Sequence, residues 1–232
     1  MVYTLTFYLR TPVILTAPLH LDALLSAVHP DMHGGGVVSK ITDKSEIKQA
    51  PLPLDSAKLG RAWVWCASAA EFADDAQYYE DKFARRKTDH DYLYMRGRQT
   101  RTFGPQKDLM AAVYGVVTPW VRFLASSANL HDLRHIAKRI KSVGAHREKG
   151  YGQVERMEIQ PVDLDFTACL VDDGRARRNL PGTLAEGRIV SMVNVRPPYW
   201  HACTMEQGVT VGGKCRLREG VWLNENRRAA RK

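Results

Sequence analysis

The part of the chain that most constrains its fold is residues 129–159, whose pattern predicts a helix, a glycine-rich loop and a strand in that order. Apolar residues recur at helical spacing over Asn129–Val143, and Asn129 is a favourable N-cap residue. Gly144 follows where a left-handed residue commonly ends a helix. The pattern of Gln153–Ile159 predicts the strand. This unit indicates a fold of mixed α and β structure.

The N-terminal part predicts the same two kinds of element. Val2–Arg10 alternates apolar and polar residues and is rich in β-branched and aromatic side chains, which favours a strand. Leucines and a valine at helical spacing predict a helix over Leu21–Val28, which Pro30 would end. Further strand-like runs are Arg61–Ser68, its expected hairpin partner Gln77–Phe83, and Met110–Ala125, which Pro119 divides.

The composition changes at Pro161, beyond which the chain has short β-like runs and no helical pattern. These runs are Asp165–Val171, Arg188–Val195, Val209–Val211 and Arg216–Leu223. We therefore expect an α+β domain over residues 1–161, a small β-rich domain over residues 162–223, and a flexible basic tail over residues 224–232. Within the first domain, residues 82–107 are expected to form a basic, exposed insertion.

The positive charge is concentrated in the later part of the chain. The sequence has 34 lysines and arginines against 25 aspartates and glutamates, a formal net charge of +9. The excess lies in four clusters: Lys82–Lys107, Arg134–Lys149, Arg175 to Arg178, and the segment from Lys214 onward. Clustered cations bind phosphate backbones by releasing counterions, which favours a nucleic-acid partner over the alternative of a merely basic, soluble surface.

Several classes of protein are disfavoured by missing motifs. The four cysteines, which form no CxxC pair, are expected to be reduced thiols, and His131 with His135 would supply too few ligands for zinc, so no metal site is expected. No dinucleotide or phosphate-loop fingerprint appears, and no cofactor is expected. No apolar run reaches the roughly 18 residues of a membrane span, and the N-terminus is unlike a signal peptide, so we expect a cytoplasmic protein without membrane contact.

The glycine-rich loop, residues 144–152, has the chemistry to hold an RNA backbone. Its three glycines permit positive φ angles, and the N–H groups of such a turn can form an anion-binding nest. Arg147 and Lys149 can make charge-assisted contacts with phosphate, while Tyr151 can stack on a base or pack inward. The alternative, a tight turn with glycine caps and no ligand, explains the loop chemistry equally well.

The same residues resemble a known family. A helix followed by GxxRxxGYGxV and a strand, here Gly144, Arg147, Gly150-Tyr151-Gly152 and Val154, is similar to the signature of the RAMP superfamily of CRISPR-associated proteins. The strand-like run Trp120–Leu124 before the helix fits this unit, and Pro18–Leu25 resembles the start of Cas-five-type subunits. The pieces Arg178–Pro181 and Pro197–Trp200 resemble the type IV version, the Csf-three subunit.

This resemblance implies a ferredoxin-like (RRM-like) βαββαβ core whose glycine-rich loop faces RNA. It implies a non-catalytic subunit of a type IV effector that binds the 5′ handle of the guide RNA (crRNA), caps the backbone filament and lies near the target-DNA flank. Its partners would be the backbone and large subunits, and residues 82–107 would be the thumb between guide and target. The candidate RNA-binding residues are Gly144, His146, Arg147, Lys149, Gly150, Tyr151, Gly152, Arg61, Arg85, Arg86, Lys87, Tyr94, Arg96, Arg98, Arg101, Arg134 and Lys138.

Two alternatives remain open. Cas-six-type relatives cut precursor guide RNA without a metal, and a histidine often supplies the acid–base help because its pKa is near neutral. The histidines that could do so here are His20, His29, His33 and His146. The other alternative is a scaffold that contacts only protein partners.

Overall fold

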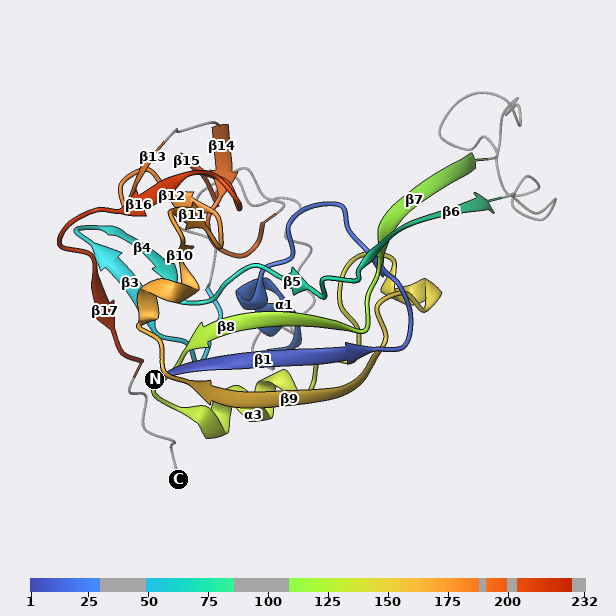
Figure 1. Cartoon of the computed structure of the whole chain (residues 1–232), viewed down its shortest axis with the longest axis horizontal. Helices are drawn as coiled ribbons and strands as arrows, with labels where there is room; N and C mark the ends of the chain where they lie inside the picture. The colour runs from blue at the N-terminus through green and yellow to red at the C-terminus, as the bar shows by residue number, and fades with distance from the viewer. Residues whose placement is uncertain (30–48, 86–108, 188–190, 200–203, 227–232) are drawn as a thin grey trace, which may run out of the picture.

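The computed structural model describes residues 1–29, 49–85, 109–187, 191–199 and 204–226, and it is a mixed, mostly β structure. Its central element is a four-stranded antiparallel sheet with the strand order β5-β8-β1-β9 (Figure 1). These strands are β5 (Glu71–Phe72), β8 (Trp120–Ser126), β1 (Val2–Leu9) and β9 (Val154–Val162). The α+β class predicted from the sequence is confirmed.

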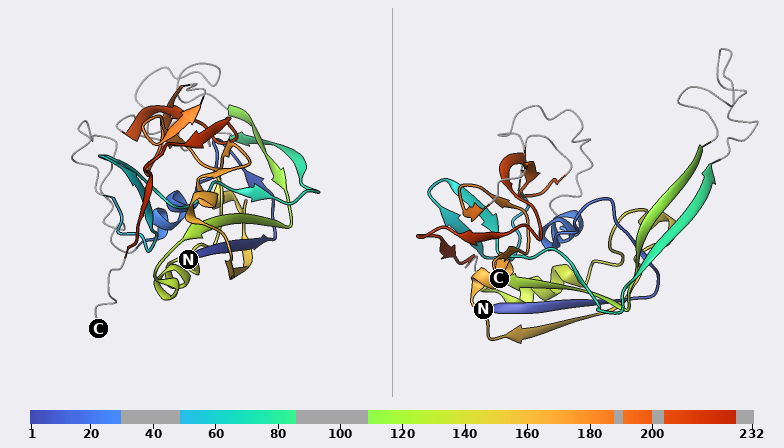
Figure 2. Two further views of the ribbon diagram at one scale, coloured as in Figure 1. Left: turned by 60° about the vertical axis from the view of Figure 1, so that its left-hand side comes forward. Right: turned by 45° about the horizontal axis from the view of Figure 1, so that its top comes forward.

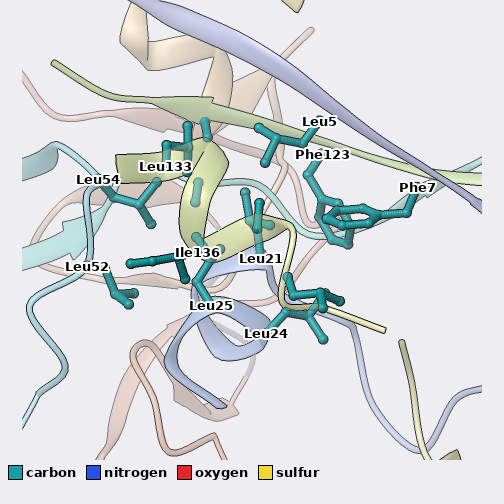
Figure 3. Packing of buried hydrophobic residues seen from close by; sticks show 14 of the residues in the cluster. Leu5, Phe7, Leu21, Leu24, Leu25, Leu52, Leu54, Phe123, Leu133 and Ile136 are labelled. Carbon is teal, nitrogen blue, oxygen red and sulfur yellow. The ribbon is translucent and has the colours of Figure 1, made fainter. Parts of the chain in front are cut away.

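Two helices, α1 (Leu21–Val28) and α3 (Leu130–Ala137), pack on one face of this sheet. The alternation of β1 places Leu5 and Phe7 on the helix side, where both are fully buried. There they meet leucines of α1 and Leu133 of α3 (Figure 3). Each fully buried side chain of this kind contributes about 1.5–3 kcal/mol of transfer free energy.

The helix α3 is shorter than its sequence pattern predicts. Its start is as expected, because the Asn129 side chain accepts a hydrogen bond from the Asp132 backbone N–H at 3.1 Å. Its end at Ala137 is earlier, because the chain beyond it pairs with the entry to β9. The Val154 N–H donates to the Lys141 carbonyl at 2.9 Å, and the Val143 N–H donates to the Gly152 carbonyl at 2.9 Å. The assignment of Gly144 as the helix cap is therefore wrong.

A long hairpin of β6 (Gln77–Arg85) and β7 (Leu109–Val117) projects from the body of the molecule (Figures 1 and 2). The prediction that Gln77–Phe83 pairs with Arg61–Ser68 is wrong, since β6 pairs with β7 and β4 (Ala62–Trp65) pairs with β3 (Ser56–Leu59). The hairpin reaches beyond the predicted thumb at both ends, and the residues 86–108 lie outside the described part. The short strand β2 (Val13–Ile14) adds to β7 at the base of the hairpin.

The chain beyond residue 162 consists mainly of short strands. They are β10 (Val171–Asp172), β11 (Arg175–Ala176), β12 (Leu180–Pro181), β13 (Ala185–Gly187), β14 (Ser191–Asn194), β15 (Met205–Val209), β16 (Cys215–Leu217) and β17 (Trp222–Asn224). The strand predicted at Asp165–Val171 is instead the 3₁₀ turn η5 (Phe166–Cys169), because the Asp165 carboxylate accepts the Thr167 N–H and caps it.

This C-terminal part shares its core with the N-terminal part. β17 pairs with β3, and one buried cluster joins Val2 and Leu124 of the central sheet to Leu170 and Val209. The described helices include none that is long and apolar enough to cross a membrane.

Candidate nucleic-acid interface

The glycine-rich loop is held against β2 and the connection that leads into it from β1. The Ala145 N–H donates to the Ile14 carbonyl at 2.8 Å, and the Gly152 N–H donates to the Pro12 carbonyl at 2.7 Å. Gly152 has a φ of +62°, and a Cβ there would lie 1.9 Å from the Val143 carbonyl oxygen. Only glycine fits such an approach, so the loop backbone is fixed by its contacts with the rest of the fold.

The centre of the loop is the 3₁₀ turn η4 (Arg147–Lys149), whose three side chains are exposed. His146 and Gly150 flank it in left-handed conformations, with φ angles of +54° and +86°. The turn therefore presents two cations and one carboxylate, Glu148, on the surface. Hydrogen bonding of Glu148 to its own backbone N–H, and then to His146, lowers the pKa of this carboxyl, so it is ionised at neutral pH.

Four N–H groups of the expected anion-binding nest are already occupied. The N–H group of Ala145 bonds to β2 and that of Gly152 to the β1–β2 connection, while those of Lys149 and Gly150 bond to carbonyls of the loop itself. The hydroxyl of Thr11 also donates a hydrogen bond to the Gly150 carbonyl, at 2.8 Å. These four groups are not free to bind phosphate, so the charged side chains of Arg147 and Lys149 would supply the main contacts.

Tyr151 joins the loop to the hairpin. Its hydroxyl donates to the Asp81 carboxylate of β6 at 2.5 Å, and the hydroxyl of Tyr79 donates to the same oxygen at 3.1 Å. The Tyr151 hydrogen bond is the main reason that the pKa of Asp81 is lowered, and the same bond raises the pKa of Tyr151. Of the two roles considered for Tyr151, the structure shows packing, with its ring 6.2 Å from that of Tyr79.

The pair Tyr79 and Asp81 was missed as part of the site. The sequence contained a usable signal, because residues two apart on a strand share one face, and a tyrosine and an aspartate on that face can hold a second polar group. The predicted insertion began at Lys82, so it included neither residue.

The other candidate residues are dispersed. Arg61 lies in the β3–β4 turn, on the opposite side of the molecule from the β6–β7 hairpin (Figures 1 and 2). Arg134 and Lys138 are exposed at α3, and Arg85 is the last described residue of β6. The candidates outside the described residues are Arg86, Lys87, Tyr94, Arg96, Arg98 and Arg101. The fold thus brings together the loop and the hairpin base, but not Arg61.

The basic cluster Arg175 to Arg178 is not a surface for phosphate as a whole. Arg178 is fully buried, where its guanidinium contacts Asp22 of α1 at 3.1 Å and the Val195 carbonyl at 2.8 Å. Arg177 is paired with Glu71 and Asp172, at 2.9 Å and 2.6 Å. Counting these arginines as one phosphate-binding cluster was wrong, because residue counting does not show which charges the fold neutralises internally.

The four histidines considered for catalysis lie in different settings. His20 is 2% exposed, and burial, followed by the nearby charge of Arg178, holds its pKa well below the usual value. His29 is 7% exposed, and His33 lies outside the described residues. His146 lies 3.4 Å from the Glu148 carboxylate. Within the described ranges, no group of three or more His, Cys, Asp and Glu side chains is placed to hold a metal ion.

Comparison with known families gives one match. Residues 3–115 match the model of the family described as CRISPR type IV associated protein Csf3, whereas no curated protein matches the chain. The matched segment runs from β1 into β7 and includes the connection that holds the glycine-rich loop. The type IV part of the resemblance inferred from the sequence is therefore confirmed: residues 3–115, just under half of the chain, match the Csf3 family of type IV CRISPR-associated proteins.

Proposed function

We propose that the chain is a non-catalytic subunit of a type IV CRISPR ribonucleoprotein and binds the 5′ handle of the guide RNA. The observation that carries this proposal is the exposed turn Arg147–Lys149, fixed in place beside the base of a projecting hairpin. Its cations are pre-positioned by backbone bonds and by the Tyr151–Asp81 contact. Little loop entropy remains to be lost when phosphates bind.

The topology supports a ferredoxin-like, RRM-like core of the RAMP type. The strands of the central sheet and the two helices on it follow one another in the chain as β1, α1, β5, β8, α3 and β9, with the other elements inserted between them. The antiparallel order β5-β8-β1-β9 is the arrangement that a βαββαβ core adopts. The β6–β7 hairpin enters between the second and third strands of this core, which suits a thumb. In this proposal the subunit caps the backbone filament, contacts the backbone and large subunits, and lies near the target DNA.

The proposal also holds that this subunit leaves RNA uncut. The near-complete burial of His20 and His29 supports it, since a general acid or base must reach the scissile group. Incubation with repeat RNA in EDTA tests this part: intact RNA is expected. Site-specific cleavage that His29→Ala or His146→Ala abolishes would establish the endoribonuclease instead.

The loop assignment is tested by filter binding of a handle RNA at several salt concentrations. Arg147→Ala/Lys149→Ala is expected to weaken binding about tenfold or more and to reduce the slope of log K against log salt by about 1.4, since each contact with a single strand contributes about 0.7.

The matched control is Lys214→Ala/Arg216→Ala, which removes the same charge at exposed residues around β16. It is expected to change the affinity far less. Equal losses in the two double variants would show a diffuse basic surface, and unchanged affinity in Arg147→Ala/Lys149→Ala would remove the loop from the interface.

A further inference from the structure

A small pocket lies away from the glycine-rich loop, between the segment before α1 and the C-terminal strands β14 and β15. Its volume is about 230 Å³, and its walls include Ala17, His20, Met192, Asn194, Tyr199 and Met205. That volume equals roughly seven or eight waters of about 30 Å³ each, and it is below the roughly 300–1,000 Å³ of pockets for larger ligands. The pocket suits a single flat ring system.

Two side chains in the pocket wall have buried polar atoms for which the described residues supply no hydrogen-bond partner. In the part of the chain that the structure describes, neither ring nitrogen of His20 nor the Asn194 side-chain oxygen has a hydrogen-bond partner. The Asn194 amide nitrogen donates to the Tyr199 carbonyl, which identifies the oxygen as the free atom. A buried polar atom without a hydrogen bond lowers the stability of the fold by about 1–3 kcal/mol. A ligand that forms hydrogen bonds with these atoms would recover part of that free energy.

The aromatic side of this wall is held in place by stacking and hydrogen bonds. The His20 ring stacks on that of Tyr199, with centroids 4.3 Å apart and planes 6° from parallel. The Tyr199 hydroxyl is fixed in turn by the Asp22 carboxylate at 3.0 Å and by Arg178 at 2.7 Å. On the other side, Met192 is 51% exposed, and methionine side chains adapt readily to the faces of aromatic rings.

The neutral lining of the pocket favours an uncharged ligand. Among the described lining residues, none is ionised at neutral pH, since the lowered pKa of His20 keeps its imidazole neutral. The Arg178 charge behind the wall is already balanced by Asp22. A phosphate or carboxylate would therefore gain no cation here. A neutral ring can donate to the Asn194 oxygen and exchange a hydrogen bond with the neutral imidazole, which has one donor and one acceptor.

We propose that this pocket binds one nucleobase, either the unstacked base of an RNA strand or the base of a free nucleoside. The two sources share the same chemistry, a flat neutral heterocycle with hydrogen-bonding groups on its edge. Base recognition here is separate from phosphate binding at the glycine-rich loop and does not depend on the turn Arg147–Lys149.

The test follows the fluorescence of 2-aminopurine in two arms with the full-length chain, one using the free riboside and the other a single-stranded RNA with one 2-aminopurine. Ala17→Trp places a bulky ring at the exposed rim of the pocket, and Thr16→Trp is the matched control at the neighbouring exposed residue. We expect Ala17→Trp to weaken binding of the probe at least about tenfold, and Thr16→Trp to remain within about twofold.

A response of both probes to Ala17→Trp shows that the pocket accepts a free base, and a response of the RNA probe alone identifies the strand as the source. Equal binding by wild type and Ala17→Trp in both arms overturns the proposal. Arg147→Ala/Lys149→Ala should leave riboside binding unchanged, so failure of the loop assignment can be told apart from failure of the pocket.

A second variant, His20→Phe, keeps a ring beside Tyr199 and removes both unpaired nitrogens. We expect the denaturant midpoint to rise while riboside affinity falls, the pattern of a group kept for binding at a cost in stability. Full riboside affinity in a folded His20→Phe chain would contradict the role of the imidazole.

Discussion

Gly152 is the residue whose backbone most restricts the glycine-rich loop. Gly152→Ala should destabilise the fold by about 2–4 kcal/mol, since it adds a left-handed alanine and a clash with the Val143 carbonyl oxygen. Gly150→Ala is the control: its φ is also positive, but the nearest atom to the new Cβ is 3.6 Å away, so about 1 kcal/mol is expected. Urea unfolding measures both, and equal losses would contradict the close approach at Gly152.

Arg178 and Asp22 form an ion pair with fully buried side chains. Arg178→Met should cost about 3–5 kcal/mol because it leaves the Asp22 carboxylate buried without its cation. The double variant Asp22→Asn/Arg178→Met should cost much less than the sum of the single changes, since neither charge then remains. Chemical unfolding of the four chains gives the coupling free energy, and additive losses would show that the two groups do not depend on each other.

The buried imidazole of His20 should make the free energy of unfolding depend on pH. Its pKa in the folded chain lies below the ordinary value of 6.5, so below that pH the unfolded chain binds a proton that the folded chain does not. Stability from this group is complete above about pH 6.5 and is lost as the pH falls through and below it. Between about pH 7.5 and 5.5, wild type should therefore lose more stability than His20→Phe in urea unfolding. Parallel losses would place the sensitivity elsewhere.

At the scale of elements, Tyr151 is expected to control how firmly the β6–β7 hairpin is held against the loop. Tyr151→Phe removes the hydroxyl that Asp81 accepts, so amide hydrogen exchange in β6 and in η4 should accelerate without loss of the central sheet. Tyr78→Phe is the control, because Tyr78 is 69% exposed and precedes Tyr79 on the strand, so it lies on the other face. Unchanged exchange in Tyr151→Phe would show that the backbone bonds alone hold the loop.

The elements that the sequence predicts well are those determined by their own residues. The alternation of β1, the spacing of α1 and the Asn129 cap are local patterns, and all three are present in the structure. The errors arise where pairing with a distant segment determines the local structure. Residues after Ala137 leave the helix to pair with the entry to β9, and β6 pairs with β7 across a long insertion. Local propensity does not depend on these distant partners and therefore cannot predict the pairing.

At the scale of the whole molecule, the net charge says less about where phosphate can bind than the position of each charged side chain does. Arg147 and Arg178 both lie in basic clusters of the sequence, yet Arg147 is exposed on a turn and Arg178 is fully buried. The glycine-rich loop could be located from its motif, because glycines mark a backbone that must approach another closely. The nucleobase pocket could not, since Ala17, Asn194 and Met205 come from separate segments, and their residue types carry no signal of their own.

The shared core of the two halves predicts that residues 1–161 do not fold alone. The two side chains that hold the Asp22 carboxylate, those of Arg178 and Tyr199, lie beyond residue 161, as does β17, which completes the β3–β4 sheet. Removing them exposes buried apolar residues and leaves a buried carboxylate unpaired. The fragment 1–161 should therefore lack a cooperative thermal transition and bind a hydrophobic dye, whereas the full chain should melt cooperatively. A fragment that melts at the same temperature as the full chain would show that β1 to β9 and their helices are sufficient, so that the C-terminal strands serve the pocket rather than the fold.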